Sequence, residues 1–425
     1  MSIEELYKIF LQQNQKICTD TRKIEKGAIY FALKGGNFDA NSFALAAIEG
    51  GCAYAVVDNP ALVHDQCIVV PDALKTLQDL ANFHRKQFKI PVLGITGTNG
   101  KTTTKELVGA VLSTQFKVHY TKGNLNNHIG VPLTLLSMTK DTEIAIIEMG
   151  ANHLFEIEFL CKIAEPDYGL VTNMGKAHLE GFGSFEGVIK TKSEMYDFAS
   201  LHNGKVFVNA ADQLLMKQSA HVKQRILYQN AGFYGDVRAL SPSVTAMLHI
   251  GKEETEIATK LFGEHNLINM IAAAAVGKEF GISTLNIKKA LEEYQPDNNR
   301  SQIKKSPKGN TLILDAYNAN PTSMSVALTA FAKIGAKNKI AIVGDMLELG
   351  EASEAEHKNI IRLLELNNIK AFLVGAEFIK CASTFQSFQN SSDLKNFLAL
   401  QNIENTTVLI KGSRGIKLEA VEAVL

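Results

Sequence analysis

The chain has 425 residues, and at about 100 to 200 residues per domain it should form two to four domains, of which we expect three. Its 44 basic and 44 acidic residues give a formal net charge of zero, which argues against a nucleic-acid partner because polyanion binders usually carry a basic excess. The longest apolar run in an expected helix, residues 270–277, is far below the roughly 18 residues that span a bilayer, so no membrane span is expected.

The N-terminal segment lacks two features of a secretory signal. MSIEELYKIF is acidic where such a signal is basic, and no small-residue cleavage site follows an apolar segment. The five cysteines are scattered and form no C-x-x-C pair. We therefore expect a cytoplasmic protein with free thiols. Residues 1–88 contain strands such as GAIYFALKG and AYAVVDN with only modest helices, and this pattern predicts a small N-terminal α/β domain.

Residues 89–296 show β-branched runs that alternate with helical patterns, as is typical of a parallel sheet covered by helices. The expected strands are residues 92–96, 143–150 and 168–173, and the expected helices are 101–114, 154–165 and 184–199. The first strand runs through GTNGK directly into its helix. We predict a central parallel-sheet ATPase domain with a P-loop.

A polar stretch, residues 295–310, interrupts the alternation and predicts a domain boundary. The pattern then resumes with strands expected at 311–317, 339–346, 371–377 and 406–415, helices at 321–334 and 353–366, and a short terminal helix. Residues 297–425 are thus predicted to form a smaller, Rossmann-like domain. The fold class is α/β, with three domains.

The segment GITGTNGKTTTKE places a glycine-rich turn between a buried strand and a helix N-terminus, the arrangement that phosphate binding needs. Two glycines let backbone N–H groups converge on anionic oxygens, a lysine supplies a point charge, and a threonine hydroxyl can ligate Mg²⁺. The strict Walker spacing would need glycine where Ile95 stands, so this loop is a shorter variant, G-x-x-G-K-T. The predicted ATP-binding residues are Gly97, Thr98, Asn99, Gly100, Lys101, Thr102 and Thr103.

Polar residues recur at the carboxyl ends of the expected strands, the edge where open α/β sheets bind ligands. Glu148 ends an apolar strand, and its desolvation cost favours a nearby cation such as Mg²⁺. His178 follows the next strand and Lys192 lies on the helix beyond it. Taken alone, such a histidine is more often a surface or core residue, and such a lysine is usually solvated.

The C-terminal domain repeats this arrangement with Asp315, Asp345 and the segment KGSRG at residues 411–415. The two aspartates can orient a ribose or an amine, whereas Lys411 and Arg414 can clamp a carboxylate or a phosphate. Each residue on its own could equally be a helix cap or a loop charge.

Several of these segments resemble the Mur ligase family, the ATP-dependent amide-bond-forming enzymes of bacterial cell-wall synthesis. GITGTNGKTTTKE is similar to the family's phosphate loop, GNLNNHIGVPLTLL to its substrate segment, IEMGANH and NMGKAHLEGFGS to its metal-binding turns, and FGEHNLINMIAAAA to its nucleotide-contacting helix. TDTR, FALKGGNFDAN, DAYNANPTSM and GDMLELG most resemble the members that add D-alanyl-D-alanine. The DNPR-type motif of the member that adds the third peptide residue is not found in the sequence.

The resemblance implies an enzyme that joins D-alanyl-D-alanine to UDP-N-acetylmuramoyl-tripeptide through an acyl phosphate. The N-terminal domain would hold the uridine nucleotide, the central domain ATP, and the C-terminal domain would close with the dipeptide. The implied cofactors are ATP, two Mg²⁺ ions and a CO₂-derived carbamate on Lys192. Its partners would be its small-molecule substrates, UDP-N-acetylmuramoyl-tripeptide and D-alanyl-D-alanine, with no nucleic acid, and we expect a monomer.

The same resemblance assigns residues to each task. Catalysis would rest on Lys101, Lys192, His178 and Glu148. The metal ligands would be Thr102, Glu148, His178 and carbamylated Lys192. The adenosine contacts would be Asn266, Asn269, Arg300 and Asp315. The other substrates would be bound by Thr21, Arg22, Lys34, Asn124, Asn126, Asn127, Asp345, Lys411, Ser413 and Arg414.

Three alternatives remain open at this point. One is the Mur ligase that adds the third peptide residue. Another is a folylpolyglutamate synthetase, which resembles the same central and C-terminal domains but lacks a module like residues 1–88. The third is a P-loop NTPase that acts as a switch or motor, in which Asp345 and KGSRG would have no evident role.

Overall fold

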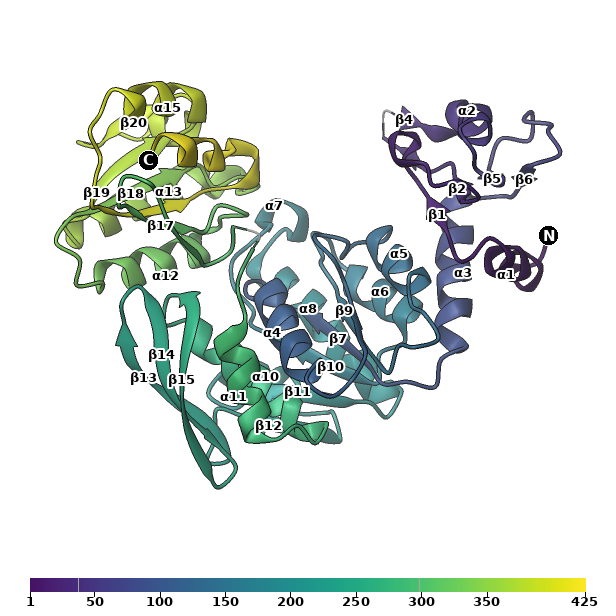
Figure 1. The fold of residues 1–425 in the computed structure, drawn as a ribbon, viewed down its shortest axis with the longest axis horizontal. Coiled ribbons are helices and arrows are strands. Elements are labelled where there is room, and N and C mark those ends of the chain that lie inside the picture. Colours follow the sequence, from purple (N-terminus) through teal and green to yellow (C-terminus); the bar gives the residue numbers. More distant parts are fainter. Residues whose placement is uncertain (37, 298) are drawn as a thin grey trace.

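The computed structural model describes residues 1–36, 38–297 and 299–425, and Figure 1 shows three units strung along the longest axis of the molecule. The N-terminal unit contains a parallel sheet in the order β1-β2-β5-β6. Its strands are β1 (Ile17–Cys18), β2 (Ile29–Phe31), β5 (Tyr54–Val57) and β6 (Cys67–Val69), beside a small hairpin of β3 (Lys34–Gly35) and β4 (Phe38–Asp39).

Helix α3 (Ala73–Lys86) joins the N-terminal unit to the central one. It begins at Asp72, whose side chain accepts a hydrogen bond from the Lys75 backbone N–H. Its apolar face packs on α1 (Ile3–Gln12) and on the central helices α5 (Gly130–Leu136) and α6 (Glu156–Ala164). One continuous hydrophobic cluster therefore runs from the N-terminal helices into the central unit, whereas α2 (Ala44–Glu49) belongs to a separate N-terminal cluster.

The central sheet has six parallel strands in the order β12-β11-β10-β7-β9-β8. They are β7 (Val92–Thr96), β8 (Val118–Tyr120), β9 (Ile144–Glu148), β10 (Tyr168–Val171), β11 (Lys205–Asn209) and β12 (Gln224–Tyr228). Alternate residues point to opposite faces, so Val92 belongs to one hydrophobic cluster while Leu93 and Ile95 belong to the other. The strands predicted at 92–96, 143–150 and 168–173 are confirmed.

Helices cover both faces of this sheet, as parallel sheets require. The helices α5, α6 and α8 (Phe185–Leu201) lie on one face, and α4 (Lys101–Leu112), α10 (Asn266–Glu279) and α11 (Thr284–Glu293) lie on the other. Short helices α7 (Leu179–Phe182) and α9 (Gln213–Gln218) follow β10 and β11.

An antiparallel sheet of β13 (Phe233–Leu240), β14 (Ser243–Ile250) and β15 (Glu253–Phe262) was not expected from the sequence. Its inner residues, including Val244 and Ile257, pack on α10, which carries Met270 and Ile271. Because α10 is covered by α4 on one side and by this sheet on the other, it is apolar nearly all round.

The C-terminal sheet has the order β16-β17-β21-β18-β19-β20, with only β16 antiparallel. Its strands are β16 (Gln302–Lys305), β17 (Thr311–Leu314), β18 (Lys339–Gly344), β19 (Lys370–Val374), β20 (Gln386–Phe388) and β21 (Thr407–Lys411), and its helices are α12 (Pro321–Ala332), α13 (Ser353–Leu366), α14 (Ala376–Lys380) and α15 (Ser391–Ala399). The expected terminal helix is a 3₁₀ helix, Leu418–Val424.

The predicted α/β class is confirmed, with one mainly parallel sheet in each unit. The first of these sheets ends at residue 69 and the second begins at residue 92, and the second ends at residue 228 and the third begins at residue 302. The domain boundaries expected at 88 and 296 fall inside these two intervals and stay predictions. No helix in the described part of the chain is both long and apolar enough to cross a membrane.

Candidate active site

The phosphate loop lies between β7 and α4, at the carboxyl edge of the central sheet. Gly97 and Gly100 have φ angles of +139° and +78°, a region that favours glycine. A Cβ atom at Gly97 would lie 2.0 Å from Thr172 Oγ1, and one at Gly100 would lie 2.9 Å from Asn269 Oδ1. Both backbone conformation and close packing therefore require glycine at these two positions.

Lys101 folds back over the loop and donates hydrogen bonds to the carbonyl oxygens of Gly97 at 2.7 Å and Thr98 at 2.9 Å. Burial lowers the pKa of Lys101 to about 8, and the carboxylate of Glu148 partly opposes this shift. The ammonium is thus held at the loop, where an anionic phosphate would restore the lost solvation.

Glu148 ends β9, and its side chain is only 1% exposed. Its Oε1 accepts hydrogen bonds from Thr102 Oγ1 at 3.1 Å and from Asn126 Nδ2 at 2.9 Å. Its Oε2 has no hydrogen-bond partner and lies 3.5 Å from Nζ of the fully buried Lys105. A buried carboxylate oxygen without a donor, next to the Thr102 hydroxyl, fits a divalent cation.

His178 and Lys192 lie near the lysine of the loop, although they do not join Glu148 in a compact ligand cluster. Among the residues that the structure describes, no group of three or more His, Cys, Asp or Glu side chains could hold a metal ion by itself. Lys192 is 2% exposed, and burial together with the charge of Lys101 lowers its pKa to about 7. His178 Nδ1 contacts the Glu348 carboxylate of the C-terminal unit, while burial lowers the His178 pKa.

A chain of hydrogen bonds links the residues predicted to contact adenosine. Asn269 accepts from Thr104 Oγ1 at 3.1 Å and donates to Asn266 Oδ1 at 2.9 Å. Asn266 in turn donates to Ser301 Oγ at 3.1 Å. The structure thus brings α4, α10 and the start of the C-terminal unit together.

The other two predicted adenosine residues lie on the C-terminal side of this chain. Asp315 accepts from the Ser301 backbone N–H at 3.1 Å and from Lys411 Nζ at 2.6 Å. The Arg300 guanidinium carbon lies 3.7 Å from the ring centroid of Tyr317, and its Nε is buried without a hydrogen-bond partner. An unpaired N–H in such a place suits an additional acceptor.

The phosphate loop also contacts the C-terminal unit directly. Asn320 Nδ2 donates to Asn99 Oδ1 at 2.8 Å, and Asn320 also caps the N-terminus of α12 through Ser323 N–H. Beside this contact lies a cavity of about 100 Å³, lined by Ala177, His178 and the loops 318–320, 347–349 and 413–415. Its lining includes Ser413 and Arg414, two of the residues predicted to bind substrate.

Asp345 lies outside the lining of that cavity. Its carboxylate is buried and accepts hydrogen bonds from the backbone N–H groups of Glu377 and Phe378, so it caps α14. Burial raises the Asp345 pKa despite these donors. Glu348, three residues further along GDMLELG, lines the cavity instead. No sequence signal marks Glu348, whereas Asp345 directly follows the strand and so drew the prediction.

The remaining predicted substrate residues are spread along the chain. Lys34 pairs with Asp58 at 2.9 Å in the N-terminal unit, and Arg22, next to Thr21, pairs with Asp20 at 2.8 Å. Arg22 is largely exposed, and the whole N-terminal unit lies at the opposite end of the molecule from the C-terminal unit (Figure 1).

Of the three asparagines in GNLNNHIG, Asn126 binds Glu148, as described above. Asn127 Oδ1 accepts from the backbone N–H groups of Ile129 and Gly130, which fixes the start of α5. Asn124 is exposed on the same turn. This turn therefore lies next to the candidate metal site.

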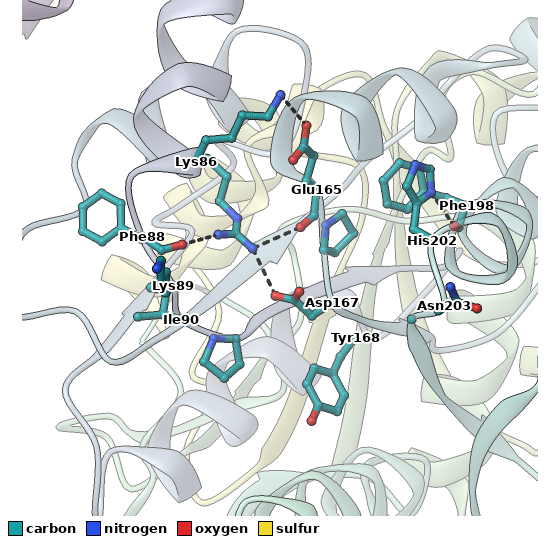
Figure 2. A pocket seen from close by; sticks show the side chains of 14 residues that line it. Lys86, Phe88, Lys89, Ile90, Glu165, Asp167, Tyr168, Phe198, His202 and Asn203 are labelled. Carbon is teal, nitrogen blue, oxygen red and sulfur yellow. Dashed lines mark hydrogen bonds and ion pairs between the residues drawn. The ribbon is translucent and has the colours of Figure 1, made fainter.

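A larger cavity, of about 760 Å³, lies at the amino ends of β7, β10 and β11 (Figure 2). Its organising group is the buried guanidinium of Arg85, which donates to the carbonyl oxygens of Ala164, Phe88 and Glu165 and to Asp167 Oδ2. Ligands of open α/β sheets bind at the carboxyl edge, so we assign this cavity no part in the reaction.

Arg85→Ala is expected to lower the free energy of unfolding by about 2 to 3 kcal/mol, because three carbonyl oxygens and one carboxylate would lose their donor. Chemical denaturation would measure the change, with the exposed Lys89→Ala as the matched control from the same cavity. The folded variant should keep its turnover. Equal stability of the two variants would contradict this role for Arg85.

Comparison with known proteins gives a consistent result. The family model of the Mur ligase middle domain matches residues 95–277, and that of the Mur ligase glutamate ligase domain matches residues 299–414. The UDP-N-acetylmuramoyl-tripeptide–D-alanyl-D-alanine ligase of Bacillus subtilis is 36% identical, over 95% of this chain and 92% of that protein.

Solved structures resemble the chain over nearly its full length. MurF from Acinetobacter baumannii is 32% identical with a TM-score of 0.88, covering 98% of this chain and 97% of that one. MurF ligase from Thermotoga maritima, solved in complex with ADP, is 26% identical with a TM-score of 0.86, covering 97% of each chain.

Proposed function

Because the chain belongs to the Mur ligase family, we propose that it is the ATP-dependent ligase that joins D-alanyl-D-alanine to UDP-N-acetylmuramoyl-tripeptide. The product is the UDP-linked pentapeptide used in peptidoglycan synthesis. Full-length relatives with this activity in their names favour it over the ligase that adds the third residue, over folylpolyglutamate synthetase and over a nucleotide switch.

One structural observation supports this proposal most strongly. Asn99 of the phosphate loop is hydrogen bonded to Asn320, and Asn320 lines the cavity between the central and C-terminal units. A phosphoryl donor at the loop would therefore lie next to a small-ligand site. A ligase needs this proximity because the activated carboxylate must meet the amine before water reaches it.

The reaction follows from the chemistry of its groups. A carboxylate is a poor electrophile, so an oxygen of the tripeptide's terminal carboxylate attacks the γ-phosphorus of ATP, the bond to the β-phosphate oxygen breaks, and ADP leaves. The amine of D-alanyl-D-alanine then attacks the acyl phosphate carbon, loses a proton, and expels inorganic phosphate. Lys101 and the loop N–H groups offset charge on the transferring phosphoryl group.

Magnesium would be held by Glu148 and Thr102, with ATP oxygens and water as the remaining ligands. This donor set fits because Glu148 Oε2 is buried without a hydrogen-bond partner. Bound there, the ion would neutralise phosphate charge during transfer. His178, which contacts Glu348, would contribute to a second ion.

Lys192 would carry a carbamate. In that reaction the neutral amine attacks CO₂, a new N–C bond forms, and one proton leaves to solvent, which turns a cation into an anion. The Lys192 pKa of about 7 supports it, because a large share of the amine is unprotonated near neutral pH. An anion at this buried position would also remove the repulsion between Lys192 and Lys101.

The other site assignments remain part of this proposal. Thr21, Arg22 and Lys34 would contact the uridine nucleotide. Asn124, Asn126 and Asn127 would contact the sugar peptide. Asn266, Asn269, Arg300 and Asp315 would surround adenosine. Asp345 would act indirectly, through the loop that follows it, whereas Lys411, Ser413 and Arg414 would lie close to the dipeptide. The enzyme would be a monomer, and it would work in the cytoplasm, where ATP is available.

The test compares phosphate release from ATP and magnesium in three reactions. One contains UDP-muramoyl-tripeptide with D-alanyl-D-alanine, the second contains folate with glutamate, and the third contains neither pair. We expect rapid release only in the first reaction, together with a product of pentapeptide mass. Phosphate release that did not depend on the dipeptide would refute the proposed function.

A further inference from the structure

The cavity between the central and C-terminal units is bordered by two residues in an unusual backbone conformation. His178 has a φ of +50° and Glu348 a φ of +63°, although neither is glycine. Such conformations cost free energy, and they persist where the surrounding structure enforces them, often at ligand sites. Their side chains meet across the cavity.

Hydrogen bonds to buried side chains fix the loop that carries Glu348. The Met346 backbone N–H donates to Nε2 of the fully buried His357 at 3.1 Å, and His357 Nδ1 donates to the Ser353 carbonyl oxygen at 2.7 Å. The Leu347 backbone N–H donates to Ser413 Oγ at 3.0 Å. The position of the Glu348 backbone is therefore set by the fold. Its side chain contacts His178 but is still 58% exposed, so a ligand in the cavity can reach the carboxylate.

The same cavity also contains a positive group. Arg414 lines it, and its Nη1 donates to the Tyr317 hydroxyl at 3.4 Å while its guanidinium carbon lies 5.3 Å from the Tyr317 ring centroid. One carboxylate and one guanidinium thus border a space of about 100 Å³ whose other walls include Leu347 and Ala319. This combination suits the charged groups of a small zwitterion, and the space is too small to enclose a nucleotide.

We propose that Glu348 is the specificity-determining residue that binds the ammonium group of the incoming D-alanyl-D-alanine, while Arg414 binds its carboxylate. This inference rests on the proposed function and assigns the amine end of that substrate. Two oppositely charged anchors select a free dipeptide by the charges of its two termini. A ligand with a blocked or missing amine would leave the Glu348 carboxylate without its partner and would bind weakly.

The test is a steady-state comparison of wild type, Glu348→Gln, Glu348→Asp and the neighbouring, exposed Glu351→Gln. For Glu348→Gln we expect the KM for D-alanyl-D-alanine to rise by about 10- to 100-fold with the KM for ATP unchanged, because one charge-assisted hydrogen bond is lost. Glu348→Asp should lie between, and Glu351→Gln should match wild type.

A second readout separates amine binding from support of the loop. A des-amino analogue of the dipeptide should inhibit wild type at least tenfold more weakly than a non-reactive analogue that keeps its ammonium group. In Glu348→Gln the two inhibitors should become nearly equal, whereas a merely structural role would weaken both by the same factor.

Three outcomes would overturn the inference. They are an unchanged dipeptide KM in Glu348→Gln, a rise in the KM of every substrate together, or unchanged discrimination between the two inhibitors. Failure of wild type to consume the dipeptide at all would instead refute the proposed function, so the two failures are distinguishable.

Discussion

Lys101→Ala should reduce ATP-dependent phosphoryl transfer by about 10³-fold while the protein stays folded. Lys101 is the loop cation, and its ammonium contacts the carbonyl oxygens of Gly97 and Thr98. Lys105 cannot replace it, because its Nζ is fully buried and donates to the Thr121 carbonyl oxygen at 2.6 Å. Single-turnover phosphate release would measure the loss, with the exposed Lys122→Ala as the control.

We also expect Lys101→Ala to change the pH dependence of the Tm. The pKa of Lys101 falls from 10.5 to about 8 on folding, so keeping this amine protonated costs folding free energy. That cost is fully present below pH 8 and disappears as the pH rises through 10.5. Lys101→Ala should therefore have a Tm at or above that of wild type at pH 7, and the difference should shrink between pH 8 and 10.5. Normal turnover, or a collapse of the Tm, would refute the assignment.

Removing CO₂ from the buffer should lower turnover by at least tenfold, and bicarbonate should restore it, if Lys192 works as a carbamate. The expectation follows from burial of Lys192 close to Lys101, where a second ammonium is disfavoured and an anion is stabilised. Lys192→Ala should be inactive and insensitive to bicarbonate.

Lys190→Ala provides the matched control, since Lys190 is exposed on the same helix, α8. This variant should keep both the activity and the bicarbonate response of wild type. A Lys192→Ala variant that still responded to bicarbonate would place the CO₂ effect elsewhere. Equal turnover of wild type with and without CO₂ would exclude a functional carbamate.

Seven strands of the two larger sheets could be predicted because they read as apolar runs, namely β7, β9, β10, β17, β18, β19 and β21. The strands β8, β11, β12, β16 and β20 were not expected. VLGIT matches β7 residue for residue, and the helix expected at 353–366 matches α13. The antiparallel sheet of β13 to β15 was missed because its strands alternate exposed and buried residues, so they contain no continuous apolar run like those of the buried parallel strands.

The structure places Lys101 and Glu148 at the carboxyl edge of the central sheet, where the sequence pattern expected them, and their roles stay predictions. Prediction from sequence fails where tertiary contacts decide which of two nearby residues borders the cavity. Asp345 and Glu348 lie in the same short segment, yet the first caps α14 and the second borders the cavity. That difference depends on His357 and Ser413, which reach the segment from elsewhere in the chain.

The hydrogen bond between Asn99 and Asn320 also bears on how this protein can be divided. A fragment that stopped before β17 would contain every residue of the phosphate-loop motif, yet the Asn99 side chain would have lost its partner Asn320, the N-cap of α12. Nucleotide affinity measured on such a fragment would describe a different loop from the one in the whole chain. For this enzyme the smallest piece that keeps every contact of the phosphate loop therefore extends beyond the motif as far as residue 320.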